Sequence, residues 1–242
     1  MAVAQSKWEK LGGGIQIRTE GSCSFNEDSL LLAAFSRADR SRRACDLGTG
    51  CGILPLLWCR REAPPSITAV EQSRTAYELA VRNVEENGLT ERVRVEHADL
   101  RDFWRTVRER YDLLTMNPPY FKAGSGASSA DPEISAARQD SMASIEEICF
   151  SAVRMLHNGG RFCICFPAFR LCDALEAMRA NRLEPKRLRL VSARPGSAPR
   201  LALVEGVPGG GPGLTVEPEM ASLDLEGKRS AAMEEYLNGG VR

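Results

Sequence analysis

A chain of 242 residues is long enough for one large α/β domain, and its 43% hydrophobic and 26% charged residues are ordinary for a globular protein. The 32 basic and 32 acidic residues balance, which excludes a polycation that would bind nucleic acid through net charge alone. No apolar run approaches the roughly 20 residues that span a bilayer. The first residues also lack the apolar core of a secretion signal, so we expect a cytoplasmic protein without membrane contacts.

Strand and helix patterns alternate from residue 44 to about residue 207, which predicts an α/β fold with a mostly parallel sheet and helices on both faces. A helix is expected at 25–38, capped near Asn26, ahead of the first strand. The first half of the sheet region then predicts strands at 42–46, 66–71, 93–99 and 111–117, with helices at 51–63 and 73–88 between them. Asp46, Glu71 and Asp99 are expected to end the first three of these strands.

The second half predicts a helix at 144–160, opened by Ser144 and Glu147 at capping-box spacing and closed by Asn158, Gly159 and Gly160. A strand at 161–166, a helix at 169–181 and a pair of strands at 186–194 and 199–206 follow, the pair forming a hairpin at the sheet edge. Residues 123–141 are small and polar, which is typical of a functional or mobile loop. We expect seven strands in one structural domain, with residues 1–40 as an N-terminal extension that covers a cofactor and residues 41–242 as the catalytic domain.

The eight cysteines form no C-x-x-C pair and lie mostly in apolar patterns, which favours buried thiols over zinc ligands or disulfides. We therefore expect no metal. The two histidines, His97 and His157, are expected to be surface or packing residues.

The first strand leads into the glycine loop "DLGTGCG", which contains Asp46, Gly48, Gly50 and Gly52. A dinucleotide fingerprint is G-x-G-x-x-G and holds a pyrophosphate. Here the spacing is one residue shorter, and the acid before it would repel a phosphate but accept hydrogen bonds from an ammonium group. This combination suits S-adenosylmethionine (SAM). Glu71 is placed to hold the ribose hydroxyls and Asp99 the adenine amine; a degenerate nicotinamide site or a glycine turn without ligand are the alternatives.

The fourth strand ends in Asn117-Pro118-Pro119-Tyr120, a stiff turn that carries an amide and an aromatic ring. The Asn117 oxygen and the Pro118 carbonyl can both accept from one planar –NH2 group, and Tyr120 or Phe121 can stack on a flat heterocycle. Two such acceptors would turn the lone pair of a conjugated amine toward the sulfonium methyl, with no strong base required. The alternative is a Pro-Pro turn that only closes a strand.

With these motifs, the chain resembles class I SAM-dependent methyltransferases that methylate amino groups, which have a Rossmann-like fold. It is more narrowly similar to the bacterial tRNA1(Val) adenine-N6-methyltransferase family, which modifies the adenine just 3′ of the anticodon. The resemblance includes "FNEDSLLLAAF", "DLGTGCGILPLL", "AVEQS", "HADL", "NPPYF" and "LHNGGRFCICFPAFRL". The resemblance implies SAM contacts at Phe25, Asp28, Gln72 and Leu100 in addition to the acids and glycines above, and substrate contacts at Tyr120, Phe121, Lys122 and Arg138. Where the family tends to carry Arg-Glu or Arg-x-Glu, this chain has Arg138-Gln139-Asp140.

The expected function is N6-methylation of an adenine in RNA, with tRNA as the expected partner of a monomer or weak dimer. The alternatives are N5-methylation of a glutamine in a protein such as a release factor, N2-guanine or N6-adenine methylation of ribosomal RNA, and a non-catalytic RNA-binding module. The glutamine enzymes usually add an N-terminal helical domain, for which about forty residues leave no room. The expected RNA surface comprises Lys7, Lys10, Arg18, Lys122 and the basic run Arg179–Arg200, for which a solvated face is the alternative.

Overall fold

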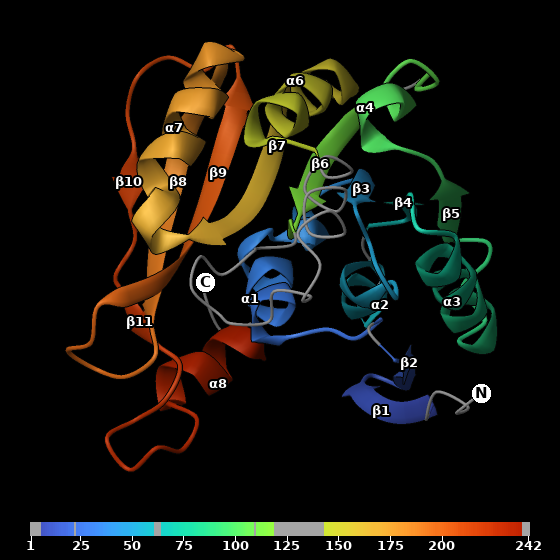
Figure 1. Cartoon of the computed structure of the whole chain (residues 1–242), viewed down its shortest axis with the longest axis horizontal. Coiled ribbons are helices and arrows are strands. Elements are labelled where there is room, and N and C mark those ends of the chain that lie inside the picture. Colours follow the sequence, from blue (N-terminus) through green and yellow to red (C-terminus); the bar gives the residue numbers. More distant parts are fainter. Residues whose placement is uncertain (1–5, 22, 61–63, 109, 119–142, 239–242) are drawn as a thin grey trace, which may run out of the picture.

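The computed structural model describes residues 6–21, 23–60, 64–108, 110–118 and 143–238. A twisted sheet forms its centre (Figure 1). The long strands are β3 (Arg43–Leu47), β4 (Ser66–Glu71), β5 (Val93–His97), β6 (Tyr111–Met116), β7 (Leu156–Pro167), β8 (Leu183–Ser192) and β9 (Pro199–Pro208), and the short ones are β10 (Thr215–Val216) and β11 (Met220–Ala221). Within the described chain the strand order is β10-β8-β9-β7-β6-β3-β4-β5, with β11 also paired to β8.

The direction of the strands confirms the predicted sheet. Strands β3 to β7 pair in parallel, whereas β9 runs antiparallel to both β7 and β8. The last long strand is therefore the antiparallel one. It lies between β7 and β8 rather than at the edge, so its first residues reach the same end of the sheet as the last residues of its parallel neighbours.

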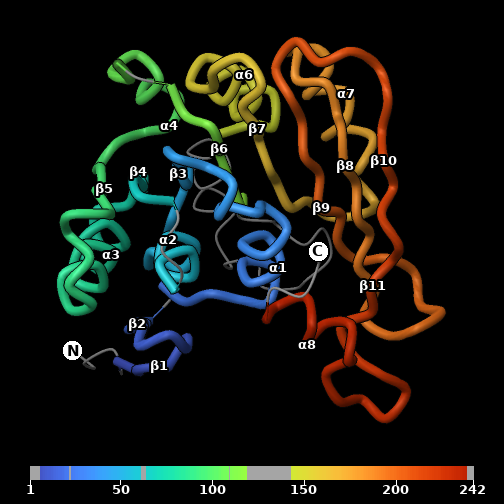
Figure 2. Tube along the Cα trace, turned by 180° about the vertical axis from the view of Figure 1, so that it is seen from behind, coloured from blue at the N-terminus to red at the C-terminus, as the bar shows by residue number. Residues whose placement is uncertain are grey.

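Helices cover both faces of the sheet, as the two views show (Figures 1 and 2). One face packs against α1 (Glu27–Phe35), α2 (Ile53–Cys59), α3 (Arg74–Glu86) and α8 (Ala231–Leu237), and the other against α4 (Leu100–Phe103), α6 (Ile145–Met155) and α7 (Leu171–Ala180). Short 3-10 turns are η1 (Ala38–Arg40) and η2 (Ala168–Arg170). Along β7, Cys163 and Cys165 face the first layer while Phe162, Ile164 and Phe166 face the second, as strand alternation requires.

A hairpin that the sequence analysis did not predict precedes α1. Strands β1 (Ser6–Gly12) and β2 (Ile15–Glu20) pair antiparallel as a separate two-stranded sheet. Two asparagines one turn apart on α3 hold β2: Asn83 exchanges hydrogen bonds with the backbone of Arg18, and Asn87 does so with Gln16. These side-chain amides replace a strand partner for β2, and Asn83 Nδ2 also donates to Cys51 O in the glycine loop at 2.8 Å.

Two predicted boundaries were wrong. Strand β5 ends at His97, because Asp99 is the N-cap of α4 and accepts from Arg101 N. Helix α6 ends at Met155 instead of near Gly160, because Leu156 is extended and pairs with Tyr111. The pairing of β7 with β6 shifts register between Tyr111 and Leu113, which leaves room for residues 157–160 of β7. Asn158, Gly159 and Gly160, which were predicted to end the helix, therefore belong to β7. The predicted capping box of Ser144 and Glu147 is present.

The eight cysteines all lie in the described residues; none forms a disulfide, and six are buried. Within the same residues, no cluster of three His, Cys, Asp or Glu side chains is arranged to hold a metal ion. No helix among them has the length and apolar character needed to cross a bilayer.

Candidate active site

The ends of the parallel strands surround a cavity of about 930 Å³, within the range typical of small-molecule sites. Gly48 after β3, Glu71 at the end of β4 and Asn117 after β6 all line it. Because β9 runs in the opposite direction, its first residues, including Arg200, line the same cavity. The sheet topology thus brings four separate segments to one site, as expected for an open α/β sheet.

The glycine loop curls under this cavity with three residues in the left-handed region. Gly48, Gly50 and Gly52 have φ values of +66°, +58° and +87°, which explains why each is glycine. A Cβ added at Gly50 would meet no atom within 4 Å. Gly52 does not line the cavity, but it is the N-cap of α2. The open space at Gly50 leaves room for a ligand to approach the backbone.

Glu71 closes the loop from the neighbouring strand. Its Oε2 accepts from Gly50 N at 2.9 Å, and its Oε1 accepts from Ser73 N at 2.8 Å. Each carboxylate oxygen retains acceptor capacity after one such bond. Glu71 can therefore fix the shape of the glycine loop and still accept from a pair of ligand hydroxyls.

Asp46 lies at the bottom of the cavity and is 1% exposed. Its Oδ1 accepts from Thr115 Oγ1 at 2.7 Å, whereas Oδ2 has no hydrogen-bond partner in the described chain. Thr49 Oγ1 is also buried and lies close to Asp46. Burial raises the pKa of Asp46 to about 7, the hydroxyls of Thr115 and Thr49 oppose this, and the charge of Glu71 adds to it. An orphaned acceptor at this depth fits the ammonium group of a nucleoside–amino acid conjugate such as SAM.

Asn117 is held at both ends of its amide. Its Nδ2 donates to Ser29 Oγ on α1 at 2.9 Å, and its Oδ1 accepts from Cys165 Sγ on β7 at 3.0 Å. Pro118 follows it on the cavity wall. Asn117 is predictable from the sequence, whereas its two partners are not, because they come from distant segments of the chain.

The first turn of α1 forms the remaining wall. Asp28 Oδ1 accepts from Arg200 Nη1 at 2.6 Å, and Glu27 accepts from Nη2 of the same arginine. All three residues line the cavity. The resemblance implies a SAM contact at Asp28, whereas the sequence shows Arg200 only as the last residue of the basic run. Arg200 reaches the cavity because β9 runs antiparallel to its neighbours.

The structure separates the remaining predicted cofactor residues into two groups. Gln72 and Leu100 line the cavity. Asp99 does not line it. The Asp99 carboxylate accepts hydrogen bonds from Arg101 instead, and these bonds lower the pKa of Asp99. Phe25 lines a second cavity, of about 580 Å³, and packs against the core. The predicted roles of Pro119, Tyr120, Phe121, Lys122 and Arg138, and of the loop at 123–141, lie outside the described residues.

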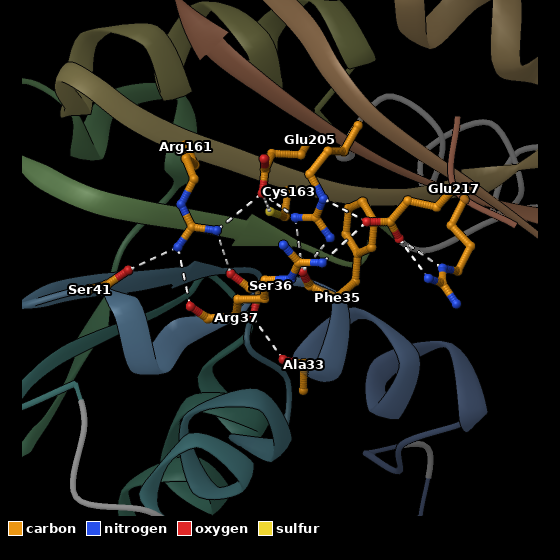
Figure 3. Close-up of polar contacts among 11 residues, drawn as sticks. Ala33, Phe35, Ser36, Arg37, Ser41, Arg161, Cys163, Glu205 and Glu217 are labelled. Atoms are coloured by element: carbon orange, nitrogen blue, oxygen red, sulfur yellow. Dashed lines mark hydrogen bonds and ion pairs between the residues drawn. The ribbon is translucent and has the colours of Figure 1, made fainter. Parts of the chain in front are cut away.

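The basic run is the clearest correction. Arg187 and Arg189 were expected on an RNA-binding or solvated face, but their side chains are only 13% and 11% exposed. Arg187 pairs with Glu205 and Glu217, and Arg189 pairs with Glu217. Figure 3 labels the two glutamates of this network. Although burial opposes it, hydrogen bonds from these arginines lower the pKa of Glu217. This part of the run is an internal ion network that uses acids distant in sequence.

Residues 26–180 match the methyltransferase small domain family. The matched segment contains the glycine loop, Glu71 and Asn117. The chain belongs to this family of SAM-dependent methyltransferases. SAM is accordingly its cofactor, and the orphaned Asp46 oxygen and the open Gly50 are consistent with that ligand.

Relatives of this methyltransferase carry a more specific name. A tRNA1(Val) (adenine(37)-N6)-methyltransferase from a Flavobacteriaceae bacterium is 30% identical over 58% of this chain and 58% of its own length. The alignment thus spans less than two thirds of that relative. A relative of the same name from Parabacteroides distasonis is 25% identical over 86% of this chain and 85% of its own. Among solved structures, a predicted O-methyltransferase from Agrobacterium tumefaciens has the same fold, with a TM-score of 0.71 at 22% identity, over 88% of this chain and 97% of that chain.

Proposed function

We propose that this protein transfers a methyl group from SAM to the N6 amine of an adenine in RNA, with tRNA as the RNA and the cytoplasm as the place of action. The observation that carries the proposal is the position of Asn117, whose amide lies at the end of β6 in the cavity that also contains Asp46 and Glu71. A target amine bound at Asn117 would therefore lie in the same cavity as the cofactor. The names of the relatives support adenine in tRNA as the substrate.

The residues at this site have separate tasks. Asp46 accepts from the cofactor ammonium, and Glu71 accepts from its ribose while it holds Gly50 in place. When bound, SAM supplies an electrophilic methyl group on a sulfonium. Asn117 Oδ1 and the Pro118 carbonyl accept the two hydrogens of the target amine and so aim its lone pair. The proton can leave to water after transfer, which agrees with a cavity wall that contains no histidine among the described residues.

The test is methyl transfer from labelled SAM to tRNA transcripts and to total RNA that lack modifications, followed by nucleoside analysis. We expect label in N6-methyladenosine, and we expect its loss in Asn117→Ala. Label in N2-methylguanosine would replace adenine by guanine as the target. Label in protein as N5-methylglutamine, with none in RNA, would overturn the proposed substrate. SAM binding without transfer to any of these would leave a non-catalytic binding module.

A further inference from the structure

We propose that Ser29 is a positioning residue that fixes which end of the Asn117 amide faces the target amine. The proposal rests on the function proposed above and adds a role that the family match does not assign. A rotation of 180° about the last side-chain bond of an asparagine exchanges its oxygen and nitrogen at little steric cost. A target –NH2 group needs the oxygen, because an amide nitrogen would present a donor to a donor. Something must therefore specify the orientation.

Ser29 links Asn117 to the N-cap of α1. Its hydroxyl has one hydrogen, which it can donate to Asn26 Oδ1 at 3.4 Å, a long and therefore weak hydrogen bond. Asn26 Oδ1 also accepts from Ser29 N at 3.2 Å, as the N-cap of α1. In this arrangement the Ser29 oxygen accepts from Asn117 Nδ2 at 2.9 Å. After a flip of the amide, the hydroxyl would have to turn away from Asn26 to donate to Asn117 Oδ1, so the contact with Asn26 would be lost.

The opposite end of the amide is specified as well. Cys165 Sγ lies 3.0 Å from Asn117 Oδ1, and its S–H is a weak donor toward that oxygen. Cys165 is fully buried on β7, the strand next to β6. A carbonyl oxygen has two lone pairs, so one remains for the target amine. Ser29 and Cys165 thus favour the same orientation from opposite sides.

The helix that carries Ser29 is itself fastened at both ends. At its C-terminal end, Arg161 donates to Ser36 O and Arg37 O (Figure 3). Arg187 donates to Phe35 O. These bonds satisfy carbonyls that the end of a helix leaves without partners. At its N-terminal end, Arg200 holds Glu27 and Asp28. Ser29 is therefore presented by a rigid element, which is the condition for a positioning role.

A double-mutant cycle of Ser29→Ala and Asn117→Ala tests the proposal. In the wild-type background we expect Ser29→Ala to lower kcat about tenfold, since one positioned hydrogen bond is lost, and to change KM for RNA less than threefold. In the Asn117→Ala background the same change should alter kcat less than twofold, because the residue through which Ser29 acts is gone. Equal losses in the two backgrounds would overturn the proposal.

Ser36→Ala is a matched control, because Ser36 is the C-cap at the other end of α1. Ser36 is also buried, but its hydroxyl donates only to a backbone oxygen, that of Ala33 at 2.8 Å. We expect it to cost similar stability and to leave kcat unchanged. If Ser36→Ala lowered kcat as much as Ser29→Ala, the effect would be a general loosening of α1 and the proposal would be wrong.

A second readout does not depend on catalysis. The two Nδ2 hydrogens of Asn117 can be assigned by NMR as the side-chain signals that disappear in Asn117→Ala. We expect their exchange with solvent to be about tenfold faster in Ser29→Ala and unchanged in Ser36→Ala. Unchanged exchange in Ser29→Ala would overturn the proposal even if the enzyme were active. Faster exchange in a protein that methylates no RNA would support the positioning of Asn117 and refute the proposed function instead.

Discussion

Thr115 Oγ1 donates a hydrogen bond to Asp46 Oδ1 at 2.7 Å, between two residues that are register partners on β6 and β3. The strand that leads to the glycine loop is thereby tied, through buried side chains, to the strand that ends in Asn117. The bond occupies one acceptor site of Oδ1, while Oδ2 accepts no hydrogen bond among the described residues. This pair therefore sets the glycine loop and Asn117 in register at the cavity.

The affinity for SAM should fall as the pH is lowered through about 7, because burial raises the pKa of Asp46 to about 7. Below that pH the free protein holds a proton on Asp46, which must leave before the carboxylate can accept from an ammonium group. Between pH 8 and pH 6 we expect Kd to rise roughly tenfold, measured by calorimetry in two buffers that differ in ionisation enthalpy. Asp46→Asn should bind weakly at both pH values, without this dependence.

The same carboxyl makes a prediction for folding. Between about pH 4 and pH 7 the folded state retains a proton that the unfolded chain has already lost. The contribution of Asp46 to the free energy of unfolding therefore decreases as the pH rises across this window. Urea unfolding gives the free energy of unfolding of the wild type and of Asp46→Asn. From pH 4 to pH 7 this free energy should decrease in the wild type relative to the variant. A constant difference would mean that Asp46 titrates normally.

Asn117→Ala should lower kcat for methyl transfer by roughly 10²–10³, since it removes a positioned polar group at the reacting amine. SAM binding should change little, because the contacts proposed for the cofactor lie on Asp46 and Glu71. Single-turnover transfer and SAM titration on the same preparation separate the two effects. Full activity in this variant would reduce the motif to a turn that closes a strand.

Arg187→Glu should unfold the protein more easily instead of weakening RNA binding selectively. It would place a third carboxylate beside Glu205 and Glu217, in a site where loss of one partner of a buried ion pair costs about 3–5 kcal/mol. Arg179→Glu is the matched control, because Arg179 is 67% exposed and pairs only at the surface with Glu184. That change should cost less than about 1 kcal/mol. Equal stability of the two variants would contradict the internal role of Arg187.

Arg200→Gln should raise Kd for SAM about tenfold, which corresponds to roughly 1.4 kcal/mol. The change leaves Glu27 and Asp28 without their counter-charge on the cavity wall, where they would repel a carboxylate of the ligand. Arg170→Gln is a suitable control, because Arg170 pairs with Asp173 outside the cavity. Unaltered SAM binding in Arg200→Gln would show that Arg200 only fastens α1.

Local signals predicted most of the fold. Alternating apolar residues and turn residues located the long strands, and the spacing of Ser144 and Glu147 located the start of α6. Features that depend on distant partners were missed. Strand β2 owes its place to Asn83 and Asn87 on α3, and the two-residue strands β10 and β11 are too short to have a pattern.

Site residues could be predicted where a suitable side chain stands at the end of a predicted strand. They could not be predicted where a contact with a distant segment of the chain brings the residue to the site. The glycine loop, Glu71 and Asn117 each follow a strand, so their convergence was foreseeable from parallel topology. Ser29 and Asn117 are 88 positions apart, and no local pattern links them. For the basic run, the sequence shows the charges but not the burial of Arg187 and Arg189. The neutralising acids are Glu205 on β9 and Glu217, which directly follows β10.

The two short strands at the end of the chain have a consequence for association. β10 pairs with Arg187 and Leu188, and β11 pairs with Val191 and Ser192, both along the outer side of β8. An uncovered edge of ten residues would offer unpaired amides and carbonyls to a strand of another molecule. Here the chain occupies that edge itself, at two points. The C-terminal segment therefore protects the sheet against edge-to-edge aggregation.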